Sequence, residues 1–553
     1  MKPAMSAADA KKDDENAGSI RLLKINYFLM NYQVKPTLYM FLLCSLLPIS
    51  CENGLQEESY SVFDETTLTK PENGLQGVRG VYAALRDNGG NGYYAGYLHQ
   101  LTEYPSDIVT TKPDSRQGIQ LDQLTYDASN SIVNDVWASI FRLISRANES
   151  EYLIGKIDYV GNGESEEVKM QHLAEVRFLR ALAYYDATSL WGDVPLNLKS
   201  SADFTEADEN PPLVPQATIE EQIVVDLQYA EEHLPSSYPA EQNGRATKGA
   251  AQGLLARLYL RRGEWQKVAD KCAEVISGGV YDLRTAAEGG VVALFDNMNR
   301  SDNEFIFVMK SSSEPGSYGI LSNSFGIQSV PWDYNRGWGN FPIHREFYAK
   351  FNPQDQRRQL LLGTYKALYG QIITLPKEFG GEGGSLPDTV QAQYTYGLKY
   401  PHVNNYNYAG YNNVSVIRYS DILLMRAEAL NELNGPNNES VSLINDVRTR
   451  SNAPVVQLSD FGSKEALRDF IFDERGLELF MEGRRRDDLI RWGRSATNGT
   501  DPLSKFKEKV KPLLRDQNTY SDAVNYALYP YPIQEIQANT SLDVSINKGR
   551  VRQ

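Results

Sequence analysis

Three glutamates, Glu474, Glu478 and Glu482, recur at four-residue steps just before the charged run 484–488 (RRRDD). Residues four apart lie on one face of an α-helix, so this spacing stacks three carboxyl groups on a helix predicted over 473–493. Two carboxyl groups about 5–9.5 Å apart across a cleft could hydrolyse a glycosidic bond. The neighbouring arginines fit ion-paired helix packing as well, and we favour that structural interpretation.

Other catalytic and metal-binding signatures do not occur in the sequence. The five histidines form no HExxH or HxH cluster, and there is no GxSxG elbow, Walker A loop or dinucleotide fingerprint. The three cysteines, Cys44, Cys51 and Cys272, have neither zinc-like nor CxxC spacing. We therefore expect a protein that is not an enzyme and that has no cofactor and no metal site. A calcium site built from oxygen ligands stays open as an alternative.

The charge and the aromatic content suggest what the chain can bind. Its formal net charge of −15 argues against a nucleic-acid partner, because phosphate backbones need a basic surface. Tyrosine is abundant, with 34 residues against 19 phenylalanines and 6 tryptophans. A tyrosine ring combines an apolar face with a polar tip, which is favoured at binding surfaces.

The N-terminal region contains a twelve-residue apolar run at 38–49 that ends just before Cys51. This run is short for a membrane span but suits the core of a signal peptide, so we predict a signal region over 1–50, with translation starting at Met30. The arrangement resembles a bacterial lipoprotein signal, which implies cleavage before Cys51 and lipidation of its thiol. A plain secretory signal and a buried helix are the alternatives. The polar stretch 51–72 then reads as a tether, and a lipid would be the only membrane anchor.

Helical periodicity dominates two blocks of the chain, about 73–280 and 417–553. The piece GLLARLYLRRGEWQKVADKCAEVI resembles a tetratricopeptide repeat, a pair of helices joined by a tight turn. Arg177 and Arg180 lie on a helix that is apolar almost all round, so each needs a buried partner. We predict a mainly α fold with tetratricopeptide-like hairpins as a scaffold; its individual helices are expected near 137–148, 166–190, 218–234, 247–262, 266–276, 422–433 and 441–447.

Between these blocks, residues 281–416 read as an irregular lobe with few short strands, such as EFIFVMK. Two segments, SVPWDYNRGWGNFP and YTYGLKYPHVNNYNYAGY, concentrate aromatic and polar residues without a helical or strand period. Loops carry binding groups more often than regular elements do. We therefore predict that this lobe faces the ligand.

Five segments together resemble the SusD/RagB family, in the family's order along the chain. They are EVRFLRALAYYDATSLWGDVPL, VIRYSDILLMRAEALNELNG, LINDVRTRSNAP, DERGLELFMEGRRRDDLIRWG and LYPYPIQEIQAN. The resemblance implies a surface-exposed outer-membrane lipoprotein of a Gram-negative glycan-utilisation system. Such a protein captures an oligosaccharide, or in some members a peptide, and passes it to a SusC-like TonB-dependent β-barrel transporter. A peptide-binding member, a secreted glycosidase and a purely structural assembly protein remain alternatives.

The resemblance assigns no ligand-contacting residues, so we chose candidates from composition. Exposed rings can stack on the apolar face of a pyranose while polar side chains bond its hydroxyls. The competing interpretation is that these rings only hold the irregular lobe together. The candidates are Tyr318, Trp332, Tyr334, Asn335, Arg336 and Trp338 in the lobe, and Tyr94 and Tyr97 in the early loop NGGNGYYAGY.

Overall fold

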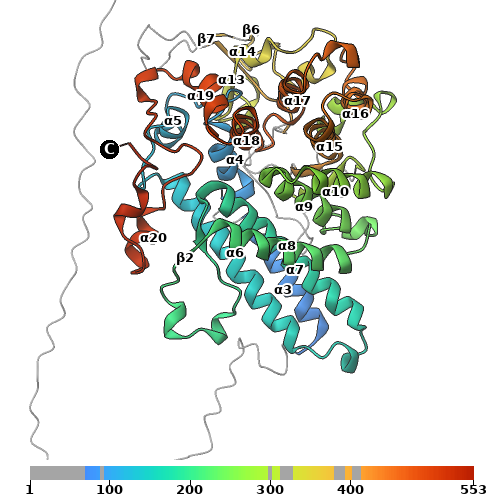
Figure 1. Cartoon of the computed structure of the whole chain (residues 1–553), viewed down its shortest axis with the longest axis vertical. Coiled ribbons are helices and arrows are strands. Elements are labelled where there is room, and N and C mark those ends of the chain that lie inside the picture. Colours follow the sequence, from blue (N-terminus) through green and yellow to red (C-terminus); the bar gives the residue numbers. More distant parts are fainter. Residues whose placement is uncertain are drawn as a thin grey trace, which may run out of the picture. The chain divides into compact units, whose positions relative to one another are not determined.

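Helices make up most of the residues that the structure describes, which confirms the predicted mainly α fold (Figure 1). The computed structural model describes residues 69–86, 92–296, 302–311, 328–375, 377–378, 393–400 and 413–552. The predicted signal region, the lipidation site Cys51 and the candidate Tyr318 lie outside these residues. No helix among them is long and apolar enough to cross a membrane.

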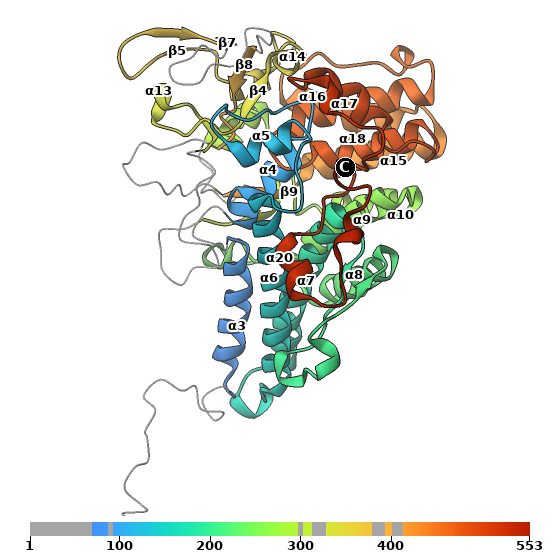
Figure 2. The same ribbon diagram turned by 90° about the vertical axis from the view of Figure 1, so that its left-hand side faces the viewer.

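The first group of helices begins at Pro71, so the last two residues of the predicted tether are helical. Side chains of Asn130, Ser165 and Thr247 cap three N-termini by accepting hydrogen bonds from backbone N–H groups. Figure 2 shows α3, α6 and α7 side by side, and α8, α9 and α10 continue the packing. The helices are α3 (Pro71–Ala84), α6 (Ser131–Lys156), α7 (Glu166–Trp191), α8 (Gln216–His233), α9 (Lys248–Arg262) and α10 (Trp265–Ser277).

These bounds confirm the predicted helices of this block to within two residues for α7, α8, α9 and α10. Gly263 adopts a left-handed φ of 73° and ends α9, which lets the chain turn into α10 as in a tetratricopeptide hairpin. Arg180 is buried and Arg177 is half-buried, and both have carboxylate partners. Arg180 pairs with Asp226 at 2.8 Å and with Glu151, and Arg177 pairs with Glu151 at 2.7 Å.

A second group of helices contacts the first group, with α15 packed against α10 (Figure 1). The prediction of one helix over 473–493 is wrong. The chain breaks at 480–484, where Met481 and Gly483 have left-handed φ angles of 58° and 71° that no α-helix accommodates. The helices are α15 (Tyr419–Asn434), α16 (Asn438–Arg450), α17 (Lys464–Leu479), α18 (Arg485–Ala496) and α19 (Ser504–Val510).

Short elements complete the described chain. The shorter helices are α4 (Tyr97–Glu103), α5 (Arg116–Asp122), α11 (Gly290–Asp296), α13 (Trp332–Asn335), α14 (Arg345–Tyr348) and α20 (Ile533–Ala538). The strands are β1 (Val194–Pro195), β2 (Leu213–Val214), β3 (Phe305–Met309), β4 (Pro342–His344), β5 (Thr364–Lys366), β6 (Ile372–Thr374), β7 (Lys377–Glu378), β8 (Gln393–Tyr396) and β9 (Val414–Arg418). All pairings are antiparallel, in the orders β1-β2, β3-β9, β4-β8-β7 and β5-β6.

The lobe has a small apolar core of its own, separate from the core of the scaffold. Its buried members are Leu362, Tyr365, Ala367, Leu375, Tyr394 and Tyr396, and Tyr334 packs against them. Tyr394 and Tyr396, the first two tyrosines of the segment YTYGLKYPHVNNYNYAGY, thus lie on strand β8 and face inward. The sequence had predicted a loop without strand period there. Packing rather than ligand contact accounts for these rings.

Buried ion pairs join the lobe to the scaffold. Arg418, at the end of β9, lies within 2.9 Å of Glu304, Glu478 and Glu482, and its side chain is fully buried. We call the following residues the buried charge cluster: Glu304, Arg357, Lys399, Arg418, Arg450, Glu474, Glu478 and Glu482.

Candidate ligand-binding site

The short helix α13 presents Trp332 at the surface of the lobe. Pro331 precedes this helix, and Arg336 ends it in a left-handed conformation with φ of 55°. Gly337 then passes so close to Val330 that a Cβ atom at position 337 would lie 1.9 Å from the Val330 carbonyl oxygen. The backbone N–H of Gly339 donates to that same carbonyl at 2.9 Å. The segment carrying Trp332 is therefore folded tightly onto itself.

The hairpin β5–β6 lies against α13 and fixes its position (Figure 2). The Leu368 N–H donates to the backbone carbonyl of Asp333, and the Tyr365 hydroxyl donates to the Asp333 carboxylate, both at 2.8 Å. The Tyr365 ring also meets the Tyr334 ring edge-on, with centroids 5.2 Å apart. Tyr365 belongs to the buried core of the lobe, so α13 and the hairpin share one support.

Four large apolar side chains on these two elements are exposed, and we call them the apolar edge. They are Trp332 at 55%, Leu368 at 43%, Tyr369 at 80% and Ile372 at 67% exposure. The other exposed large apolar residues of the described chain are spread over other segments and include no tryptophan or tyrosine. Exposed apolar groups concentrated on one pair of elements are typical of a binding surface.

The remaining lobe candidates lie around Trp332 but are less accessible. Tyr334, Asn335, Arg336 and Trp338 are all half-buried. Asn335 is the last residue of α13 and Arg336 follows it, so both lie within four residues of Trp332 in the chain. The structure thus brings five of the six lobe candidates together, with Trp332 as the most exposed; the sixth, Tyr318, lies outside the described residues.

Burial contradicts one of the two candidates in the early loop. Tyr94 is 1% exposed, and its hydroxyl donates to the Asp186 carboxylate at 2.7 Å, beside Tyr93, which donates to the same oxygen at 2.8 Å. A ring sealed in this way has no face left for a ligand, so the prediction for Tyr94 is wrong. Tyr97 is half-buried and packs against the scaffold core. Two tyrosines satisfying one buried carboxylate is a structural arrangement.

Sequence reasoning missed three residues of the apolar edge: Leu368, Tyr369 and Ile372. The strands of their hairpin are only three residues long, too short to show a period of two. The available signal was Gly370, whose left-handed φ of 88° supports the turn just after Tyr369.

The three glutamates at four-residue steps are buried structural groups. Glu474, Glu478 and Glu482 are at most 4% exposed, and their partners come from distant segments instead of the neighbouring run 484–488. Burial alone would raise the pKa of Glu482, but Arg418 and Lys399 outweigh it and lower this pKa to about 2. The ion-paired interpretation is confirmed, with corrected partners.

No group of three or more histidine, cysteine or acidic side chains within the described part of the chain is arranged to hold a metal ion. The expectation that the protein has no cofactor, and the alternative of a calcium site, stay predictions.

Two sequence profiles of known protein families match this chain. A sequence profile described as "SusD family" matches residues 303–549, and one described as "Starch-binding associating with outer membrane" matches residues 82–260. The chain belongs to the SusD family. The matches lie in both helical blocks and in the lobe, which agrees with the family resemblance of the five sequence motifs.

Individual SusD-family proteins are similar over nearly the whole chain. SusD-like protein P25 of Formosa agariphila is 29% identical over 91% of this chain and 96% of its own length. Starch-binding protein SusD of Bacteroides thetaiotaomicron is 23% identical over 91% of this chain and 94% of its own. The structure of surface glycan-binding protein A from Bacteroides uniformis matches with a TM-score of 0.68 at 18% identity, covering 86% of this chain and all of that protein. The last likeness shows a shared fold.

Proposed function

We propose that this chain is a cell-surface glycan-binding protein that captures oligosaccharides at its apolar edge without cutting them. It belongs to the SusD family, and relatives bear the names starch-binding and surface glycan-binding protein. The observation that carries the proposal is the exposed Trp332 ring, held by Asp333 and Tyr365 on a buried core. A pyranose offers an apolar face to such a ring and hydroxyls to nearby polar groups.

The arrangement favours weak to moderate affinity. A glycan stacked on a surface edge buries less area than one enclosed in a deep pocket. Part of the interaction free energy must also offset the translational and rotational freedom that the glycan loses on binding. Rigid support limits the ordering cost on the protein side, because the Trp332 segment is already folded. Such affinity suits a protein that releases its cargo to a partner TonB-dependent barrel in the outer membrane, with the chain held there by lipid on Cys51.

Substituting the rings tests the proposal directly. We expect Trp332→Ala and Tyr369→Ala to lose at least about tenfold in affinity for a bound glycan, about 1.4 kcal/mol each. Their melting temperatures should stay close to that of the wild type, because exposed residues contribute little to folding. Affinity electrophoresis through gels containing starch, laminarin or other polysaccharides measures retention. Phe204→Ala, an aromatic residue 42% exposed on another segment, is the matched control.

Two outcomes would contradict the proposal. If both ring variants migrate like the wild type in a gel that retards the wild type, the glycan site lies elsewhere on the protein. If incubation with a retarding polysaccharide releases reducing ends, the chain cuts its ligand, and the glycosidase alternative stands. Because catalysis and binding have separate readouts, each part of the proposal can fail alone.

A further inference from the structure

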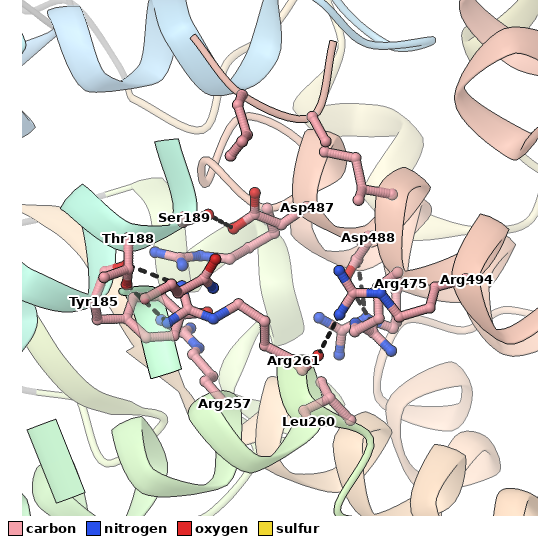
Figure 3. A pocket seen from close by; sticks show the side chains of 16 residues that line it. Tyr185, Thr188, Ser189, Arg257, Leu260, Arg261, Arg475, Asp487, Asp488 and Arg494 are labelled. Carbon is pink, nitrogen blue, oxygen red and sulfur yellow. Dashed lines mark hydrogen bonds and ion pairs between the residues drawn. The ribbon is translucent and has the colours of Figure 1, made fainter. Parts of the chain in front are cut away.

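A cavity of about 100 Å³ lies within the helical scaffold, on elements other than those of the apolar edge. Figure 3 shows Tyr185, Thr188 and Ser189 reaching it from α7, with Arg257 and Arg261 from α9. Residues of α17 and α18, Gln216 of α8, Arg484 and residues 527–528 complete the wall. Six arginines line the cavity: Arg257, Arg261, Arg475, Arg484, Arg491 and Arg494.

Carboxylates neutralise only four of these arginines directly. Asp488 pairs with Arg475 at 2.9 Å and with Arg491 at 2.7 Å. Behind the lining, Asp421 pairs with Arg257 and with Arg475 at 2.8 Å, Glu428 pairs with Arg491, and Glu220 pairs with Arg261 at 2.9 Å. Asp487, the other lining carboxylate, accepts a hydrogen bond from Ser189 at 2.8 Å, drawn in Figure 3.

Arg484 and Arg494 have no carboxylate within 4.0 Å anywhere in the ranges that the structure describes. Arg484 is 8% exposed, and its Nε donates to the Glu482 carbonyl at 3.2 Å. Its two Nη atoms make no hydrogen bond to a described residue. Arg494 is exposed, and its Nη1 donates to the Arg261 carbonyl at 2.9 Å. Neither guanidinium is therefore paired directly with a carboxylate, although Asp186 and Asp421 act on Arg484 from beyond that distance.

Neighbouring positive charges also act on Arg257 and Arg494. Burial lowers the pKa of Arg257, and the nearby Arg484 lowers it further. Burial and the charge of Arg261 do the same to the pKa of Arg494. In addition, Nη1 of Arg257 is buried without a hydrogen-bond acceptor in the described chain, in a side chain 6% exposed. A buried donor left without an acceptor is costly, so each of these features favours an added negative acceptor.

We infer that this cavity binds a small oxyanion, a sulfate, phosphate or carboxylate group, between Arg257 and Arg484, with Arg494 in the wall of the same cavity. Guanidinium groups donate two parallel hydrogen bonds to such oxygens and keep their charge at every physiological pH. The volume exceeds that of one water molecule, about 30 Å³ in the liquid, and admits a tetrahedral anion. Water can accept the free N–H bonds, but it supplies no negative charge to offset the unpaired arginines.

The oxyanion can be free in solution or can be a substituent of a sugar, and the two sources share the same chemistry. A free ion needs only a narrow entrance, whereas a sulfate ester or uronate must bring its ring to the opening. Inorganic sulfate, inorganic phosphate, glucose 6-sulfate and glucuronate are therefore the probes that separate them.

Isothermal titration of the purified full chain at constant ionic strength tests the inference. We expect sulfate or phosphate to bind with one-to-one stoichiometry and to compete with each other, while chloride at the same ionic strength has no such effect. Binding of the sugar probes as well assigns the pocket to acidic glycans, and failure of both sugars with binding of the inorganic ions assigns it to free anions. If none of the four probes binds, the inference is wrong.

Variants separate a specific site from a general salt effect. Arg484→Gln and Arg494→Gln should each weaken binding at least about tenfold, and Arg146→Gln, an exposed arginine of α6 outside the cavity, should leave it unchanged. Arg494 is exposed, so its variant folds even where the Arg484 variant does not. Anomalous diffraction from a selenate-soaked crystal should show one peak between Arg257 and Arg484. Equal affinity in all three variants, or a selenate peak elsewhere only, overturns the inference.

Discussion

Replacing Arg418 by methionine is the sharpest test of how the lobe is held to the scaffold. The Arg418 guanidinium donates to Glu304 at 2.6 Å, to Glu478 at 2.9 Å and to Glu482 at 2.8 Å, and its side chain is fully buried. Methionine preserves much of the apolar stem and removes the charge. The substitution then leaves three buried carboxylates with fewer cations.

The remaining cations set the size of the expected loss. Lys399 stays 2.7 Å from Glu482, and Arg450 stays 3.4 Å from Glu304, so no carboxylate loses every partner. Removing one member of a buried ion pair typically costs about 3–5 kcal/mol, because the charge left behind is uncompensated. Because each carboxylate keeps at least one cation, we expect the loss in the free energy of unfolding to lie near the lower end of that range. The loss should be larger at pH 8 than at pH 5, since at lower pH the stranded carboxyl groups can take up protons.

Urea unfolding followed by circular dichroism measures this loss in the wild type and in the variant. The control is Lys199→Met, which removes a surface ion pair to Asp208 at 2.8 Å from a lysine that is 52% exposed. Exposed pairs contribute about 0–1 kcal/mol. If Arg418→Met costs no more than Lys199→Met, the buried charge cluster does not hold the lobe in place, and the reasoning fails.

Two further substitutions test single contacts. Burial raises the pKa of Glu103 to about 8, above its unfolded value near 4.5, so the stability it contributes is full below pH 4.5 and is lost as pH rises toward 8. Glutamine does not titrate, so the free energy of unfolding of Glu103→Gln should rise relative to that of the wild type by up to about 1.4 kcal/mol per pH unit between pH 5 and pH 8. Urea unfolding at several pH values measures this difference, and parallel pH profiles of the two proteins would contradict it. Gly337→Ala should reduce glycan retention in affinity gels, because its Cβ would displace the Val330 carbonyl beneath the Trp332 segment. Gly462→Ala, at an open position, is its control, and equal retention would show that this backbone contact does not position the ring.

The helices were predictable because each carries a long periodic pattern and a clear end. The second predicted helix, at 166–190, is observed as Glu166–Trp191, with Ser165 as its cap. Apolar periodicity over many residues and a capping side chain both act locally, so the sequence contains them directly. The break at 480–484 depends on tertiary contacts: the N–H of Gly483 donates to Glu103, 380 residues earlier. No pattern within that segment indicates such a partner.

The binding surface was predictable in part, for a related reason. Aromatic density located the Trp332 segment, but composition cannot distinguish a ring that packs from a ring that is exposed. Tyr94 and Trp332 both lie in glycine- and asparagine-rich segments, yet one satisfies a buried carboxylate and the other is more than half exposed. Tyr369 was missed because its exposure depends on a short hairpin held against α13 by Asp333.

Stability alone does not account for the buried charge cluster, because apolar residues of similar volume often stabilise a core equally well. Ion pairs add a geometric constraint, since the planar Arg418 group at the end of β9 bonds Glu304, Glu478 and Glu482 together and so ties β9 to the residue before β3 and to the C-terminal end of α17. The same constraint bears on ligand binding, because strand β8 leads from the core beneath Trp332 to Lys399, which contacts Glu482. A ring that is exposed on a surface holds a sugar well only if its support does not have to be ordered on binding. Directional contacts far below the surface therefore contribute to affinity without touching the ligand.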